Sequence, residues 1–166
     1  GPSLDAICEH AGYTRGAFYV HFSDRDDFLV AVMERVGRPL LDALLAQHEG
    51  DDLFALAGRF ARAFVDGTYP LGPGGAVRPH QLLQACARSE RVRALYVSLV
   101  ADAIARMGQA VATSQQKATV RCDVPAEQIA TLLMALIIGA QTMADLGAPL
   151  DIAALSASAM QLLTTA

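Results

Sequence analysis

The chain has 166 residues, of which 53% are hydrophobic and 18% are charged, and its formal net charge at pH 7 is -4. This apolar composition excludes a disordered chain, and the length fits one compact domain with at most a small appendage. The negative net charge excludes a protein that coats nucleic acid over a broad basic surface, so any contact with DNA has to be local.

Two short helices joined by a tight turn are predicted at the start of the chain. Ser3 is a favourable N-cap, the apolar residues after it are spaced for one helix face, and Gly12 ends the helix. A second helix, Thr14 to Val20, again opens on a capping residue and places Phe18 one turn before Phe22. This pattern predicts a helix-turn-helix with the two phenylalanines in its core.

A long third helix is predicted from Asp24 to His48. Ser23 is its expected N-cap, with Asp26 three residues later in a capping-box arrangement. Pro39 lies inside this helix and removes one backbone hydrogen bond. The sequence therefore predicts a kink near residues 37 and 38.

The rest of the chain is predicted to be helical apart from one long loop, Gly67 to Arg78, which is rich in proline and glycine. Apolar residues recur at helical spacing in five further segments. These run from Asp51 or Asp52 to about Asp66, from Pro79 to Arg88, from Ser89 to about 114–117, from Ala126 to Leu146 and from Asp151 to Thr164. No strand, internal repeat or low-complexity tract is found, so the predicted fold class is all-α.

Composition also bears on the compartment. The longest candidate for a membrane span, Ile129 to Met143, contains polar residues, and the start of the chain does not look like a signal peptide. The three cysteines, Cys8, Cys86 and Cys122, are far apart and odd in number, which is typical of reduced thiols. We therefore expect a cytoplasmic protein without a membrane partner.

Signals for catalysis, metal binding or a cofactor are weak. The histidines at positions 10, 21, 48 and 80 form no spaced ligand set with the cysteines. The glycine run at 72–75 lacks the preceding strand and the following Lys-Ser/Thr of a phosphate-binding loop. We expect a protein that is not an enzyme and holds no metal or cofactor.

The segment from Ser3 to Leu29 resembles the DNA-binding motif of the tetracycline-repressor (TetR) family. The Ala-Gly turn at 11–12, the Arg-Gly-Ala at 15–17 and the His-Phe at 21–22 carry the resemblance. It implies a helix-turn-helix DNA-binding domain over residues 1–28 and a ligand-binding and dimerisation domain over residues 29–166. Family members begin with a further helix, so we expect N-terminal residues to be missing from this chain.

The helix Thr14 to Val20 is the expected recognition helix, whose N-terminal residues would meet base edges in the major groove. Arg15 is the best candidate base reader because a guanidinium can bind guanine O6 and N7 together. Gly16 and Ala17 permit close approach, and Tyr13 is either a core residue or a contact. By resemblance, contacts to phosphate are expected from Ser3, Thr14, Tyr19, His21 and Arg25.

A small-molecule effector is expected to bind between helices of the larger domain, where ligand sites of helical proteins form. The candidate residues have polar tips or adaptable shapes, and each of them also fits an ordinary core position. They are Phe60, Phe64, His80, Leu83, Gln84, Cys86, Tyr96, Leu99, Met107, Met134, Ile138 and Gln141. Because the set is mainly apolar, it favours a hydrophobic or aromatic effector.

A homodimer is expected through the last two helices, because one helix-turn-helix reads one half-site of double-stranded operator DNA. Effector binding would shift the helix Asp24 to His48, with Pro39 at its bend, and so change the separation of the half-site readers. Repression is the default of the family. The alternative is a helical small-molecule-binding or scaffolding dimer that does not bind specific DNA.

Overall fold

The computed structural model describes residues 3–46, 51–66, 68–69 and 78–164. Within them the chain forms helices and no strand, apart from an isolated bridge between Val120 and Thr164. The helices are α1 (Leu4–Ala11), α2 (Arg15–His21), α3 (Arg25–Leu44), α4 (Leu53–Val65), α5 (Pro79–Arg88), α6 (Glu90–Gln116), α7 (Ala126–Asp145) and α8 (Ile152–Leu163). The predicted all-α fold class is confirmed.

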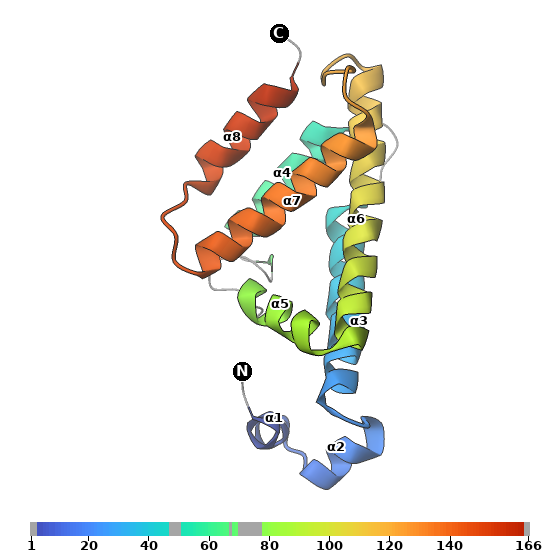
Figure 1. Ribbon diagram of the computed structural model, residues 1–166, viewed down its shortest axis with the longest axis vertical. Coiled ribbons are helices and arrows are strands. Elements are labelled where there is room, and N and C mark those ends of the chain that lie inside the picture. Colours follow the sequence, from blue (N-terminus) through green and yellow to red (C-terminus); the bar gives the residue numbers. More distant parts are fainter. Residues whose placement is uncertain (1–2, 47–50, 67, 70–77, 165–166) are drawn as a thin grey trace.

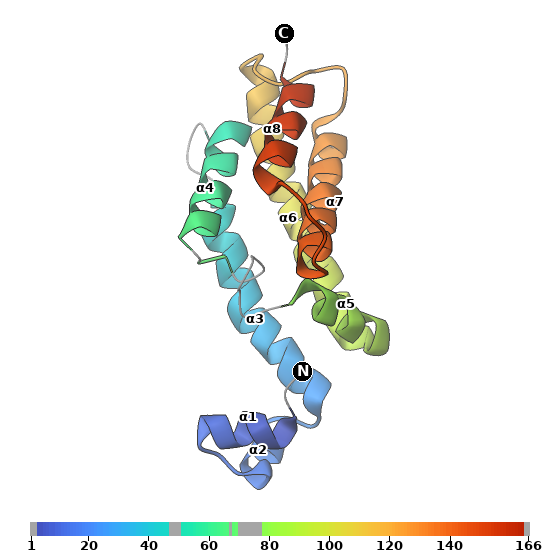
Figure 2. The ribbon, with the colours of Figure 1, turned by 90° about the vertical axis from the view of Figure 1, so that its left-hand side faces the viewer.

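The first two helices form a separate small unit at one end of the molecule (Figures 1 and 2). The Ser3 hydroxyl accepts a hydrogen bond from the Ala6 N–H at 3.1 Å and so begins α1. Gly12 ends α1 in the left-handed conformation, with φ of 72°, which glycine adopts without a steric penalty. The tight turn predicted from the sequence is therefore present.

Three phenylalanines pack the small unit together. The rings of Phe18 and Phe22 have centroids 5.1 Å apart, and Phe28 from α3 lies 5.5 Å from Phe18 and 5.1 Å from Phe22. Phe18 is buried, as is Cys8 of α1. Because Phe28 belongs to α3, this aromatic cluster fixes the first turn of α3 to the helix-turn-helix.

The start of α3 differs from the prediction by one residue. Asp24, and not Ser23, is the N-cap, and its carboxylate accepts from the Asp27 N–H at 2.8 Å. The Ser23 N–H and hydroxyl instead donate to the Asp27 carboxylate at 3.0 and 3.1 Å. The Asp27 carboxylate thus bonds the residue before the cap, whereas a capping box uses the N–H of the cap itself, and a carboxylate, the stronger acceptor, occupies the cap.

α3 is one continuous helix through Pro39, and it ends at Leu44. The predicted end at His48 is wrong by about one turn, because Leu45 already leaves the helical conformation, and the predicted kink stays a prediction. The Arg59 guanidinium of α4 donates to the carbonyl oxygens of Leu44 and Ala46 at 3.2 and 2.9 Å. A side chain of α4 therefore satisfies carbonyls that the end of α3 leaves without helical partners.

The core of the larger part lies between α6 and α7, with α3 and α4 packed against α6 and α5 packed against both α6 and α7. Val111 of α6 and Ile129 and Ala130 of α7 are almost completely buried. The buried Ser114 hydroxyl accepts the Leu53 N–H at 2.9 Å and so joins α6 to the start of α4. Asp52 caps α4 by accepting from the Ala55 N–H.

The last helix, α8, has no buried residue and lies on the outside of the bundle (Figures 1 and 2). Its Met160 and Leu163 pack partly against the core. In addition, α6 and α7 are long and apolar enough to cross a membrane, judged by length and composition alone. Both helices supply core residues here, and a core helix of a soluble protein passes the same test.

Candidate DNA-binding interface

The residues predicted to contact DNA lie on the outer surface of the small unit. Tyr13 and Tyr19 are 69% and 53% exposed, although large aromatic residues are usually buried. Arg15 and His21 are exposed at the two ends of α2, and Arg25 is exposed at the first position of α3. The small unit thus presents aromatic and basic side chains to the outside while Phe18 holds its interior.

The two hydroxyl residues of this set are helix caps, as the sequence predicts. Thr14 Oγ1 accepts the Ala17 N–H at 3.2 Å, and the Ser3 hydroxyl caps α1 in the same way. A hydroxyl that accepts one hydrogen bond still has its own proton to donate. Both caps can therefore donate to a phosphate oxygen from the positions they occupy. Gly16 is exposed beside Thr14, and Ala17 is half-buried.

Arg15 has a partner that the sequence reasoning missed. Its Nε lies 3.4 Å from Oδ1 of Asp5, which is in the first turn of α1, and both side chains are mainly exposed. The Tyr19 hydroxyl one turn along α2 and the Asp5 carboxylate raise the pKa of Arg15.

The small unit also contains an open apolar cavity of about 400 Å³. It is lined by residues from both sides of the helix-turn-helix and from the start of α3. These are Ile7, Cys8, Ala11, Tyr13, Ala17, Phe18, His21, Phe22 and Phe28. Tyr13 therefore lines this cavity and is also exposed to solvent. Its position fits both a packing role and a contact with DNA.

The residues predicted for the effector site divide into a buried group and a surface group. Met107, Met134, Phe60 and Ile138 lie in or against the main core, and Cys86 is buried, which raises the pKa of its thiol. Tyr96 and Gln141 are half-buried, as is Leu99. His80, Leu83 and Gln84 are at the surface of α5, and the side chain of Phe64 lies outside the described residues.

Tyr69 joins the buried group and was not predicted. Its ring packs edge-on against Phe60, with centroids 5.9 Å apart, and the Gln141 amide donates to its hydroxyl. Burial raises the pKa of Tyr69. Because Tyr69 lies in the segment expected to be a loop, its sequence position gave no signal that it enters the core.

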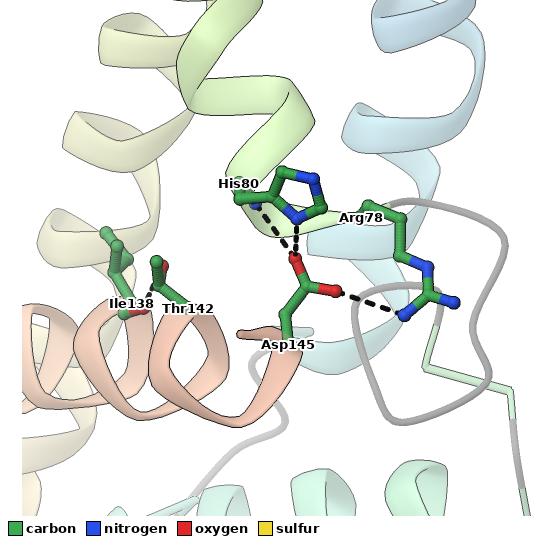
Figure 3. A network of polar contacts seen from close by, with 5 residues as sticks. All are labelled: Arg78, His80, Ile138, Thr142 and Asp145. Carbon is green, nitrogen blue, oxygen red and sulfur yellow. Dashed lines mark hydrogen bonds and ion pairs between the residues drawn. The ribbon is translucent and has the colours of Figure 1, made fainter. Parts of the chain in front are cut away.

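A second polar cluster joins the start of α5 to the end of α7 (Figure 3). Asp145 Oδ2 accepts from the His80 N–H at 3.1 Å and lies 2.5 Å from His80 Nδ1, while Oδ1 accepts from Arg78 at 3.2 Å. The Asp145 side chain is only 5% exposed. These bonds, the His80 N–H foremost, lower the pKa of Asp145.

An ion pair joins the larger part to the junction with the small unit. Arg91, in the first turn of α6, donates to Asp24 Oδ2 at 2.6 Å. The Asp27 N–H and then Arg91 lower the pKa of Asp24. Asp24 also caps α3, so α6 is bonded directly to the residue at which the helix-turn-helix passes into α3.

Comparison with known proteins gives a family match at the start of the chain and solved structures with a similar fold. Residues 2–32 match the family described as bacterial regulatory proteins, tetR family. A curated relative from Bacillus subtilis (strain 168), the uncharacterized HTH-type transcriptional regulator YwcC, is 52% identical over 33 residues. That match spans 20% of this chain and 15% of the relative.

Two crystal structures share the fold over nearly the whole chain. Reduced NemR of E. coli has a TM-score of 0.82 and 21% identity, covering 100% of this chain and 88% of that one. The SmeT–triclosan complex has a TM-score of 0.73 and 21% identity, covering 99% of this chain and 82% of that one. These likenesses establish the same overall fold.

Proposed function

We propose that this chain is a repressor of the tetR family of bacterial regulatory proteins, whose model matches residues 2–32, and that it reads operator DNA with α2. The exposure of Arg15, Tyr19 and His21 on a helix held by the buried Phe18 supports this proposal most directly. Arg15 reads a guanine, and the other two bind phosphate. Ser3, Thr14 and Arg25 add phosphate contacts, and Gly16 and Ala17 allow close approach.

The DNA-binding proposal is tested by fluorescence anisotropy at fixed salt, because affinity for DNA depends strongly on salt. The probe is a duplex selected by the full chain from a random library, compared with an unrelated duplex. Arg15→Ala should weaken binding to the selected duplex by roughly 5- to 100-fold, and Tyr19→Ala should weaken binding to both duplexes. Arg121→Ala is the matched control, because that exposed arginine pairs with Asp123 at the opposite end of the bundle.

The selection experiment also separates this proposal from its rival. A chain that enriches no sequence from the library would be a helical scaffolding or small-molecule-binding dimer instead. We propose a regulatory and not a catalytic role for this chain, and a cytoplasmic location, because the DNA that it would read lies there.

We propose that the effector is a small, mainly hydrophobic or aromatic compound that binds beside Tyr69. Phe60 provides an aromatic surface there, and Gln141 provides an amide that already bonds a phenol hydroxyl. The similar fold of SmeT was solved with triclosan, which makes triclosan a reasonable first probe. Release of the selected duplex by triclosan, lost in Gln141→Leu but kept in Gln81→Leu on the surface of α5, would support this site.

The coupling route runs through α3, which is shared by the small unit and the bundle. Arg91 of α6 is bonded to Asp24, and Leu99 of α6 lies so close to Gly37 that an added Cβ would be 3.0 Å from it. A ligand that shifts α6 would therefore move the start of α3, provided that it binds the two states with different affinity. If Pro39 is the hinge, Pro39→Ala alters effector release more than DNA affinity.

A further inference from the structure

An acidic residue lies where a DNA-binding surface should have none. Asp5 is exposed in α1, and its carboxylate faces Arg15, the candidate base reader. Charges a few ångströms from a phosphate interact within the Debye length of about 8 Å at physiological salt. Asp5 therefore repels the phosphates of any duplex, whatever its sequence. An acidic residue that weakens DNA binding in this way is expected to have another function.

The ion pair between Asp5 and Arg15 does not offset this repulsion by stabilising the fold. Both side chains are more than half exposed, at 58% for Arg15 and 66% for Asp5, and exposed ion pairs contribute little to folding. A favourable position in the first turn of α1 explains an acidic residue there. It does not explain why the carboxylate is aimed at the arginine of the neighbouring helix.

The atoms in contact suggest what Asp5 does. Its contact with Arg15 is at Nε, which has a single N–H, whereas the two terminal nitrogens of a guanidinium carry the other four N–H groups. Those terminal nitrogens are a pair of donors of the kind that bind guanine O6 and N7 together. The Tyr19 hydroxyl, one turn along the same helix, also interacts with this guanidinium and raises the pKa of Arg15.

We propose that Asp5 is a specificity-determining residue, which aims Arg15 at a guanine and penalises duplexes that lack one at that position. The inference rests on the proposed DNA-binding function. At the cognate site the guanine satisfies the oriented guanidinium, which outweighs the repulsion between Asp5 and phosphate. On a duplex without that guanine, Asp5 holds the Arg15 guanidinium away from phosphate. The repulsion between Asp5 and phosphate is then not offset.

The test compares Asp5→Asn, which removes the charge and keeps the shape, with Glu9→Gln, which removes the same charge from the same helix. Both are measured on the library-selected duplex and on that duplex with its most strongly selected guanine replaced. We expect Asp5→Asn to reduce the preference for the guanine duplex by roughly three- to fivefold, the upper part of the range for an exposed ion pair. Binding to the replaced duplex should become tighter, and Glu9→Gln should leave the preference within about twofold, as expected for residues without coupling.

A double-mutant comparison shows whether Asp5 acts through Arg15. In the Arg15→Ala background, Asp5→Asn should no longer change the preference for guanine, because nothing remains to be positioned. An unchanged preference in Asp5→Asn, an equal loss in Glu9→Gln, or a loss that persists without Arg15 would each overturn the inference. If the unaltered chain selects no sequence, the proposed function fails and the inference fails with it. If the unaltered chain binds selectively but Asp5→Asn does not change the preference, only the inference fails.

Discussion

A single buried hydroxyl connects two helices of the bundle. Ser114 of α6 is fully buried, and it accepts the Leu53 N–H at the start of α4. That N–H has no helical partner, because the first N–H groups of a helix never do. Ser114 therefore accepts a hydrogen bond from an N–H group that would otherwise need a capping side chain next to α4.

We predict that Ser114→Ala lowers the free energy of unfolding by about 1–3 kcal/mol, since it leaves a buried donor without a partner. The measurement is urea unfolding followed by circular dichroism. Thr113→Ala on the same helix is the control, because the Thr113 hydroxyl bonds only to the Gln109 carbonyl in its own helix and is exposed there. Equal losses in the two variants would contradict a special role for Ser114.

The Asp145 carboxylate makes stability depend on pH. Its pKa is lowered by the His80 N–H, the His80 ring and Arg78, so the folded state binds a proton less readily than the unfolded state. The resulting stabilisation is present above the unfolded pKa of about 4 and is lost as the pH falls through the lower folded pKa. We predict that the stability difference between the unaltered chain and Asp145→Asn shrinks as the pH falls from 5 to about 3. Thermal unfolding at a series of pH values measures it, and a constant difference would contradict the prediction.

At the scale of single elements, helices that depend on local signals were predicted well. The caps Ser3 and Thr14, the left-handed Gly12 and the start of α5 at Pro79 are all where the sequence placed them. The cap of α3 was misplaced by one residue, because Ser23 and Asp24 are both capping types. Both residues carry a side-chain oxygen that can cap, and the carboxylate of Asp24, which also bonds Arg91 far away in sequence, takes the position.

That contact predicts a measurable change in the first turn of α3. Arg91→Gln removes the charge that holds Asp24, so the capped amides at Asp27 and Phe28 should exchange hydrogen about two- to fivefold faster, in line with the small effect of exposed ion pairs. Hydrogen exchange read by mass spectrometry over residues 22–30 measures this. The difference should vanish in about 1 M salt, where the screening length is about 3 Å. Arg88→Gln, an exposed arginine at the end of α5, should leave the exchange unchanged.

At the scale of the whole molecule, periodicity predicted which residues share an apolar helix face but not how deeply each one is buried. Leu83 and Gln84 share a helix with the buried Cys86, and yet they lie at the surface. Tyr69 enters the core from a segment whose composition is typical of a loop, and Asp145 is enclosed by residues more than sixty positions away. Such placements depend on how α5 and α7 cross, which no local pattern contains.

The last two helices leave large apolar side chains uncovered. Leu132 and Leu146 on or next to α7 and Leu162 of α8 are 66%, 68% and 74% exposed. Isolated exposed leucines are ordinary, but here they occur on two consecutive helices, one of which has no buried residue. We infer that a second copy of the chain covers this surface, because one recognition helix reads only one half-site.

We predict that Leu132→Asp together with Leu162→Asp converts the dimer to a monomer, because each burial of a leucine contributes about 1.5–3 kcal/mol and a buried unpaired carboxylate adds a penalty. Sedimentation velocity at micromolar concentration measures the state. Val97→Asp is the control, since Val97 of α6 is also an exposed apolar residue and lies outside α7 and α8. The double variant should also bind the selected duplex at least tenfold more weakly, because the second half-site no longer binds intramolecularly. A double variant that stays dimeric would place the interface elsewhere, whereas a monomer with undiminished affinity would show that one α2 suffices to read the site.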